Sequence, residues 1–225
     1  MGSVRLDLHV HSHHSPDSSL TIEAIVTSLG ERGLNGFALT DHNSVAGHRE
    51  LAEWQAKFPE AILLPGIEVS TADGHLLAYG VHEAAPPHRP AAETVAWVRQ
   101  HGGVAVLPHP FRLSHGVGRA ISETADVAAI ETVNGHSSPR ANRRAAEVAR
   151  RRRLGSTGGS DVHELSDLGR AYTEFPEGTG SPAAALLALE SRSTHGSGGT
   201  LPWSGRARTE WRTIVLRLRR GLRPI

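Results

Sequence analysis

The chain has 225 residues, no cysteine, 15 histidines and a formal net charge of +1. This length suits one large domain, because barrels and other α/β folds of about 200 to 250 residues commonly stay undivided. The lack of cysteine excludes disulfides and thiolate ligands, so imidazole and carboxylate must hold any metal. No apolar run approaches the ~18 residues of a membrane helix, and no basic-then-apolar leader is visible. We therefore expect a cytoplasmic protein without integral membrane association.

Short strands are predicted to alternate with helices almost to the end of the chain. The expected strands cover residues 4–10, 36–40, 61–69, 75–81, 104–107, 127–133, 155–159 and 171–175. The expected helices cover residues 22–32, 45–57, 91–101, 139–152 and 182–192, and Thr21 is the expected N-cap of the first. This alternation favours a parallel sheet, either open or closed into a barrel. The first strand-to-helix turn lacks both GxGxxG and GxxxxGKS, which weighs against the phosphate-cradling open sheets.

The arginines are concentrated in two segments. Residues 140–153 and residues 200–225 hold seven each, and we interpret the first run as a solvated helix face. The predicted domain covers residues 1–199, and an Arg-rich amphipathic tail covers residues 200–225. One helical stripe of the tail is apolar and consists of Trp211, Ile214, Val215, Leu218 and Leu222. A helix docked on the barrel is the favoured interpretation, and the alternatives are an arm that binds nucleic-acid phosphates or a helix on an anionic membrane surface.

Histidine and acidic side chains stand at or just beyond the expected strand ends. In chain order they are Asp7, His9, His11, Asp41, His42, Glu68, His75, His109, Glu131, Asp161 and His163. Side chains two apart on a strand face the same way, so His9 and His11 should point together. All strand carboxyl ends of a βα barrel open onto one face, and buried acids and imidazoles there require a compensating charge. The pattern predicts a metal site of the kind that Zn, Mn or Fe hydrolases use. The remaining clustered histidines are interpreted as ordinary surface residues: His13, His14, His48, His88, His115, His136 and His195.

These residues resemble the PHP (polymerase and histidinol phosphatase) family over about residues 5–195. DLHVHS is similar to its first motif, LTDHN to its second, PHP to its third and GSDVH to its fourth. GIEVS and IETVNG fall where members keep a metal-bridging glutamate and an acidic strand end. The resemblance implies a distorted (βα)7 TIM-like barrel with its metal site at the carboxyl ends of the strands.

The resemblance also implies two to three divalent ions, Mn, Fe or Zn. One would take His9, His11, Glu68 and Asp161, a second would share Glu68 and add His75 and His109, and a third would take Asp17, His42 and His163. His75 is either a ligand or a plain strand residue. Asp7, Asp41 and Glu131 are the candidates for orienting the ligand imidazoles.

The activity that the resemblance implies is hydrolysis of phosphate monoesters by attack of a metal-bridging hydroxide. The expected catalytic residues are Glu68, His42, His163 and Asp161, and the expected substrates are nucleoside monophosphates, 3',5'-bisphosphates or short oligonucleotide ends. A short single-stranded nucleic acid is a further candidate partner. Candidate substrate contacts are Arg112, Arg119, Asn134 and Asn43, although surface arginines and turn asparagines would give the same pattern.

Three alternative functions stay open at this point. They are a carbamate or amide metallohydrolase on the same site, a histidinol-phosphate or phosphotyrosine phosphatase and, least expected, a non-catalytic binding module.

Overall fold

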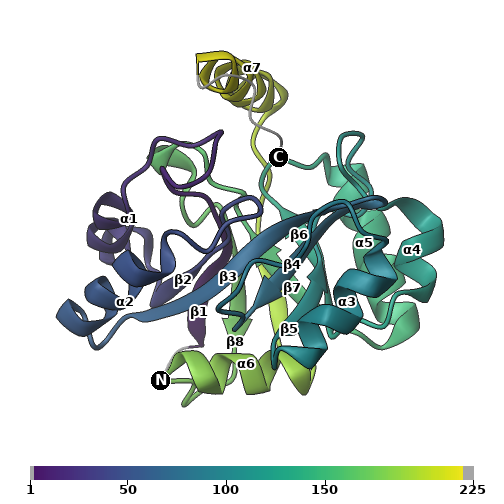
Figure 1. The fold of residues 1–225 in the computed structure, drawn as a ribbon, viewed down its shortest axis with the longest axis horizontal. Helices are drawn as coiled ribbons and strands as arrows, with labels where there is room; N and C mark the ends of the chain where they lie inside the picture. The colour runs from purple at the N-terminus through teal and green to yellow at the C-terminus, as the bar shows by residue number, and fades with distance from the viewer. Residues whose placement is uncertain (1–2, 220–225) are drawn as a thin grey trace.

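The computed structural model describes residues 3–219, which form an α/β fold around one curled sheet (Figure 1). The strands are β1 Val4–Val10, β2 Gly36–Leu39, β3 Ile62–Thr71, β4 Gly74–Tyr79, β5 Val104–Leu107, β6 Ala129–Asn134, β7 Gly155–Gly159, β8 Ala171–Phe175 and β9 His195–Gly198. The helices are α1 Ile22–Ser28, α2 His48–Lys57, α3 Ala91–Gln100, α4 Gly118–Thr124, α5 Pro139–Arg152, α6 Pro182–Glu190 and α7 Trp203–Arg219, with short 3-10 turns η1 Gly30–Arg32 and η2 Leu165–Asp167. All the predicted strands and helices are confirmed within a few residues, and α4 and β9 were not predicted.

The expectation of a purely parallel sheet is wrong. The sheet order is β7-β6-β5-β4-β3-β2-β1-β8-β9. β1, β2 and β3 run parallel, as do β5, β6 and β7, but β4 is antiparallel to both β3 and β5. The reversal follows from a tight hairpin in which Thr71 pairs with Gly74, because two intervening residues leave no room for a crossover helix.

The two ends of the sheet meet, so the barrel is nearly closed. Thr173 of β8 bridges to β7, since its Oγ1 accepts from the Gly158 N–H at 2.9 Å and donates to the Gly158 carbonyl at 2.9 Å. A Cβ at Gly158 would lie 2.3 Å from the Tyr172 carbonyl oxygen, so the glycines of the GSTGG strand permit this close approach. The predicted TIM-like barrel is therefore confirmed, whereas its sevenfold repeat stays a prediction.

A bulge in β1 directs the first histidines into the barrel mouth. The β1–β2 register shifts between Asp7 and Val10. Leu6 and Leu8 pack in the core cluster that α6 covers at one end of the barrel, while Val10 packs with Phe37 in the outer cluster under α1 and α2. Regular alternation would put Leu8 and Val10 on one face, and the extra residue of a bulge changes that pattern.

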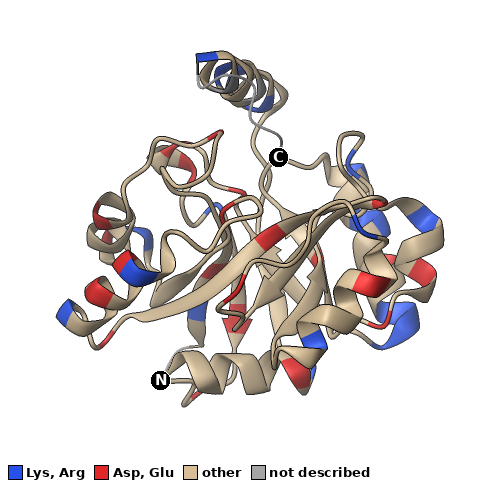
Figure 2. Cartoon of the chain, in the orientation of Figure 1, with Lys and Arg blue, Asp and Glu red and all other residues tan. Residues whose placement is uncertain are grey.

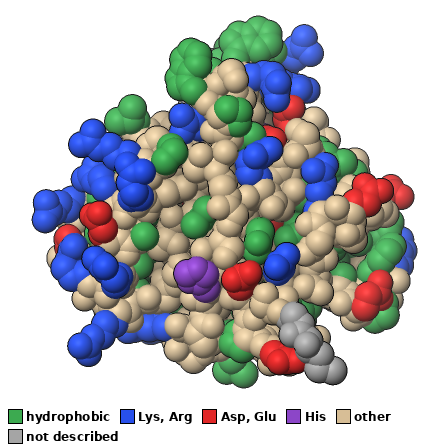
Figure 3. Space-filling model, turned by 180° about the vertical axis from the view of Figure 1, so that it is seen from behind, with side chains coloured by type: hydrophobic (Ala, Val, Ile, Leu, Met, Phe, Trp, Pro, Cys, Tyr) green, Lys and Arg blue, Asp and Glu red, His purple; other side chains and the backbone are tan. Residues whose placement is uncertain are grey.

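The basic residues lie on the outside of the barrel. Figure 2 shows them on the surface helices and on α7, and Figure 3 shows a dense basic region on one side of the molecule. The arginines of α5 are mostly exposed, as the interpretation of a solvated face requires. Within residues 3–219, no helix combines the length and apolarity needed to cross a membrane.

The tail forms α7 above the strand ends (Figure 1), and its apolar stripe is only partly buried. Trp211, Ile214 and Leu218 are 65%, 50% and 56% exposed, whereas Thr209 is only 3% exposed. The helix is held by polar contacts, since Arg206 donates to the Ser137 carbonyl at 3.0 Å and Arg212 pairs with Glu164 at 3.0 Å. The stripe contributes only partly to the docking: Trp211 and the half-buried Val215 border a cavity beneath the helix, and Ile214 borders a cavity over the predicted metal ligands. Leu222 lies outside the described residues, and the division at residue 199 stays a prediction.

Candidate metal centre

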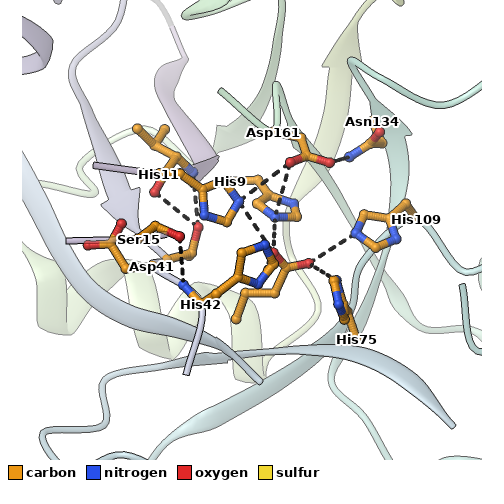
Figure 4. Close-up of polar contacts among 12 residues, drawn as sticks. His9, His11, Ser15, Asp41, His42, His75, His109, Asn134 and Asp161 are labelled. Carbon is orange, nitrogen blue, oxygen red and sulfur yellow. Dashed lines mark hydrogen bonds and ion pairs between the residues drawn. The ribbon is translucent and has the colours of Figure 1, made fainter. Parts of the chain in front are cut away.

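The structure brings all nine predicted metal ligands together at the barrel mouth, and Figure 4 labels six of them. They come from every part of the barrel: His9, His11 and Asp17 from β1 and its following loop, His42 after β2, Glu68 from β3, His75 from β4, His109 after β5, and Asp161 and His163 after β7. The first residues of β4 reach this mouth because β4 runs opposite to its neighbours. His75 therefore lies within the cluster rather than beside it.

Glu68 lies at the centre of the cluster. Its Oε1 is 2.8 Å from His75 Nδ1 and 3.0 Å from His109 Nε2. Its Oε2 is 3.1 Å from His9 Nε2, 3.3 Å from His11 Nε2 and 3.3 Å from His42 Nδ1. One carboxylate is thus within reach of five imidazoles, which is the position required of a group that bridges two cations.

Four buried groups of three side chains have their ligand atoms within 4.8 Å of one another. They are His9, His11 and Asp161; His9, Glu68 and His109; His11, Asp17 and His42; and His42, Glu68 and His75. Shared members link these groups into one cluster, so the predicted ligand sets overlap in space. The pairing of His42 with His75 differs from the predicted sets, which placed these two residues on separate ions.

The ring nitrogens of the cluster fit a bound cation. Among the described residues, buried nitrogens without a hydrogen-bond partner include His9 Nε2, both nitrogens of His11, His42 Nδ1, His75 Nε2 and His109 Nδ1. Several lie within ion-pair distance of a carboxylate, but their alignment does not make a hydrogen bond. A buried polar atom without a partner costs about 1–3 kcal/mol, and neutral imidazole nitrogens are good ligands for Zn, Mn and Fe.

The charges of the cluster compensate one another in the absence of a cation. Burial would raise the pKa of Glu68, but the surrounding histidines, His75 and His9 foremost, hold it well below its usual range. The pKa of Asp161 is likewise held low against its burial, by His9 and Arg112. Burial would lower the pKa of His11, but Asp161 and Glu68 raise it to about 10, and the pKa of His9 is also raised, by Glu68 and Asp161 against its burial.

Metal uptake is therefore expected to release protons and to strengthen as pH rises. His9 and His11 carry protons at neutral pH because their pKa values are raised, and a cation displaces these protons. The apparent affinity should increase through the neutral range and level off only near the His11 pKa of about 10. Titration calorimetry with Zn²⁺ or Mn²⁺ at several pH values, in buffers of different ionisation enthalpy, measures both quantities. An affinity that does not change between about pH 6 and 8 would contradict the protonation of these two histidines in the metal-free protein.

Glu131, Asp7 and Asp41, the carboxylates predicted to orient the ligand imidazoles, accept hydrogen bonds from different groups. Glu131 accepts from His9 Nδ1 at 3.0 Å, which leaves His9 Nε2 for a cation, and it also accepts from the His109 N–H at 2.9 Å. Asp7 accepts from the backbone N–H of Ser160 at 2.9 Å, and Asp41 accepts from Ser12 through both N–H and hydroxyl. Asp7 and Asp41 therefore position the ligand loops rather than the imidazoles.

Three of the predicted site residues hold left-handed backbone conformations. The φ angles are 50° at Asn43, 29° at His109 and 61° at Asp161. Such conformations cost about 1–3 kcal/mol each at non-glycine residues and gather at functional sites. Two of the three are predicted ligands, so the strain accompanies the turn that directs each side chain into the cluster.

The four candidate substrate contacts have different positions. Arg112 borders the cavity over the cluster and donates through Nη1 to Asp161. Arg119 is 79% exposed and pairs with Glu123 on α4, away from the cavity over the cluster, so its assignment as a substrate contact stays a prediction without support from its position. Asn134 is fully buried and donates to Glu131 at 3.0 Å and to Asp161 at 3.3 Å, so it positions these carboxylates. Asn43 exchanges two hydrogen bonds with Ser70, as a turn residue does.

Replacing Arg112 is expected to raise KM, whereas replacing Arg119 is expected to leave it unchanged. Arg112→Ala should raise KM for a phosphate monoester about tenfold, because it removes a guanidinium that borders the cluster. Arg119→Ala should leave kcat and KM within about twofold of the original, because its side chain faces solvent. Steady-state kinetics on both variants is the measurement, and equal effects would refute the distinction.

Two histidines at the mouth were wrongly interpreted as ordinary surface residues. His115 stacks on His75 with ring centroids 4.5 Å apart, and His136 lies 5.9 Å from His163. Both line the cavity over the cluster. Burial lowers the pKa of His136 to about 3, so this ring stays neutral at the mouth. His115 lies six residues after the predicted ligand His109, and His136 lies two residues after the end of β6; these positions were the available signal.

A barrel that gathers imidazoles and carboxylates at one mouth is the architecture of metal-dependent hydrolases. The chain belongs to the PHP family: the PHP domain matches residues 7–107, and the PHP-associated C-terminal region matches residues 139–194. The chain thus combines the PHP fold with a buried cluster of imidazoles and carboxylates that could hold metal ions.

Two proteins of known sequence and one solved structure are similar to this chain over different shares of its length. An uncharacterized protein of Methanocaldococcus jannaschii is 28% identical over 182 residues, which are 77% of this chain and 71% of that protein. The phosphoribosyl 1,2-cyclic phosphate 1,2-diphosphodiesterase of Eggerthella lenta is 37% identical over 86 residues, only 36% of this chain and 32% of that protein. A two-domain protein of Bacteroides vulgatus, which contains a predicted PHP-like metal-dependent phosphoesterase, superposes with a TM-score of 0.72 at 20% identity, over 94% of this chain and 70% of that chain.

Proposed function

We propose that this protein hydrolyses phosphate monoesters, with nucleotides as the substrate class. The observation that carries the proposal is the central position of Glu68 among five imidazoles. When bound, two to three Mn, Fe or Zn ions would supply an activated water and would neutralise the charge on the phosphoryl oxygens. The nine ligands named above would hold these ions, with Glu68 shared between two.

The remaining chemistry falls to side chains at the open side of the cluster. Arg112 places a positive charge beside Asp161, where it can bind a phosphoryl oxygen. His163 is the candidate proton donor to the leaving oxygen, because Asp17, 2.9 Å from its Nε2, raises its pKa against its burial. Burial lowers the pKa of His42, so this ring is better suited to act as a neutral ligand or base.

The number of ions decides which role His163 takes. With two ions near Glu68, His163 is free to donate a proton, whereas a third ion on Asp17, His42 and His163 makes it a ligand. Asp161 acts in either case as a ligand whose charge Arg112 and His9 balance. Metal analysis of the purified protein therefore decides between these two versions of the proposal.

The choice of nucleotides rests on the sugar phosphate named for one relative. The Eggerthella lenta protein acts on a phosphoribosyl substrate, and its similarity covers about a third of this chain. A ribose phosphate is consistent with a cluster that binds the phosphoryl group and leaves the sugar to the surrounding loops. A short single-stranded nucleic acid stays a further proposed partner.

The decisive experiment compares reaction classes on the purified protein. p-Nitrophenyl phosphate, nucleoside 5'-monophosphates and an aryl carbamate are incubated in parallel with added Mn²⁺, Zn²⁺ or Fe²⁺. The proposal predicts turnover of the phosphate esters, with nucleotides preferred. Turnover of the carbamate alone would replace it with the amide-type hydrolase, and less than one equivalent of metal without turnover would indicate a binding module.

A further inference from the structure

A second cavity lies beneath α7 and adjoins the metal centre. Its volume is about 360 Å³, against about 80 Å³ for the cavity directly over the cluster. The two cavities share Asp17, His163, Thr209 and Thr213 as walls. A molecule bound at the cluster can therefore extend under the helix.

The walls contributed by α7 are of two chemical kinds. Trp211, Val215 and Leu216 are apolar, while Arg212 and Arg219 are basic. Glu164 pairs with Arg212 at 3.0 Å, and Asp17 belongs to the metal cluster. One pairing carboxylate against two arginines leaves the outer part of the cavity positively charged.

Thr209 provides an independent indication of a ligand. Its side chain lies in the wall shared by both cavities, and the residue is 3% exposed. Its Oγ1 is buried without a hydrogen-bond partner in the described part of the chain. Unpartnered buried hydroxyls are uncommon in native proteins, and a ligand in the cavity would supply the missing partner.

The packing of α7 does not explain its position by apolar burial. The side chains of Trp211, Ile214 and Leu218 are each at least half exposed. The hydrogen bond and the ion pair that hold the helix on the barrel are made by Arg206 and Arg212. A helix that gains little from apolar burial contributes little to barrel stability. Its position over the mouth is better accounted for by contacts with a bound molecule.

We infer that the cavity beneath α7 receives the leaving group of the substrate, and that this group combines a flat apolar ring with a negative charge of its own. Trp211 offers a ring face for stacking, Thr209 offers its hydroxyl, and Arg212 and Arg219 bind the charge. This inference rests on the proposed phosphoesterase function, because it places the reacting phosphoryl group at the cluster.

The test uses three phosphate monoesters that differ only in the leaving group. Glycerol phosphate has neither ring nor extra charge, phenyl phosphate has the ring, and 4-carboxyphenyl phosphate has both. Trp211→Ala should lower kcat/KM about tenfold for both aryl esters and leave glycerol phosphate within about twofold. The double variant Arg212→Ala/Arg219→Ala should lower kcat/KM about tenfold for the carboxyphenyl ester alone.

Matched controls come from the same helix. Trp203 is 77% exposed, Arg208 is also exposed, and neither lines the cavity. Trp203→Ala and Arg208→Ala should leave all three esters unchanged. Uniform losses across the three esters, or equal losses in the control variants, would overturn the inference while the phosphoesterase activity itself stands.

A binding measurement separates failure of the inference from failure of the proposed function. 4-Hydroxybenzoate should quench part of the fluorescence of the four tryptophans, Trp211→Ala should abolish this quenching, and Arg212→Ala/Arg219→Ala should weaken the binding about tenfold. If no ester is hydrolysed, the proposed function fails and this titration still decides the cavity's ligand class. No binding, or binding that the arginine changes do not weaken, refutes the inference.

Discussion

Glu68→Gln is expected to lower kcat for phosphate monoesters about a thousandfold, equivalent to ~4 kcal/mol of transition-state stabilisation. The amide keeps the size of the side chain but removes the negative charge that faces five imidazoles. Metal content should fall with activity, because the bridging ligand between two ions is lost. Activity assays and metal analysis on the same preparation measure both effects.

Glu174→Gln is the matched control for this substitution. Glu174 lies on β8, its side chain is 30% exposed, and it pairs with Arg5 across the surface. Its replacement should leave kcat and metal content unchanged. The circular dichroism of both variants should match the original protein, and a Glu68→Gln variant with more than a tenth of the original activity would refute the central role of this carboxylate.

Gly159→Ala is expected to destabilise the protein by about 3 kcal/mol and to reduce its metal content. A Cβ at this position would lie 2.4 Å from His9 Cβ and 2.5 Å from Glu131 Oε1. The backbone cannot yield easily, because β7 is hydrogen-bonded to β6 and lies against β1 where the barrel closes. For a chain of this size the loss corresponds to a Tm about 6–12 °C lower.

Gly199→Ala controls for the general effect of replacing glycine. No heavy atom lies within 4 Å of a Cβ built at Gly199, so this variant should unfold within about 1 °C of the original. Thermal unfolding followed by circular dichroism, with metal analysis, compares the two variants. Equal Tm values and equal metal content would show that the close approach of β7 to His9 is not needed.

The positions of strands, helices and ligands could be predicted because their signals are local. Thr21 caps α1 through its side chain, as expected from its position before an apolar stripe. The rule that strand ends of a barrel meet at one mouth predicted that His9, His42, Glu68, His109 and Asp161 converge. Asp17 was implied by the resemblance of the motifs to the PHP family.

The directions of individual strands and side chains could not be predicted in the same way. The sequence of β4 predicts a strand but not its direction. Only the hairpin with β3 makes β4 antiparallel and brings His75 to the mouth. Asn134 has the same local sequence whether it turns to solvent or bonds to Glu131 and Asp161. Arg112 and Arg119 are seven residues apart on one loop and helix, yet one borders the cluster and the other faces solvent.

The amino-acid sequence by itself determined the strand and helix positions, because alternation, capping and turn chemistry act over a few residues, while the barrel and the set of metal ligands were implied by the resemblance of its motifs to the PHP family. Only the tertiary structure decided that Glu68 lies at the centre of five histidines, that Glu131 and Asn134 hydrogen-bond to the ligands, and that α7 brings Thr209 and Ile214 to the mouth. These features depend on contacts between residues far apart in the chain, whose free energies no local pattern contains.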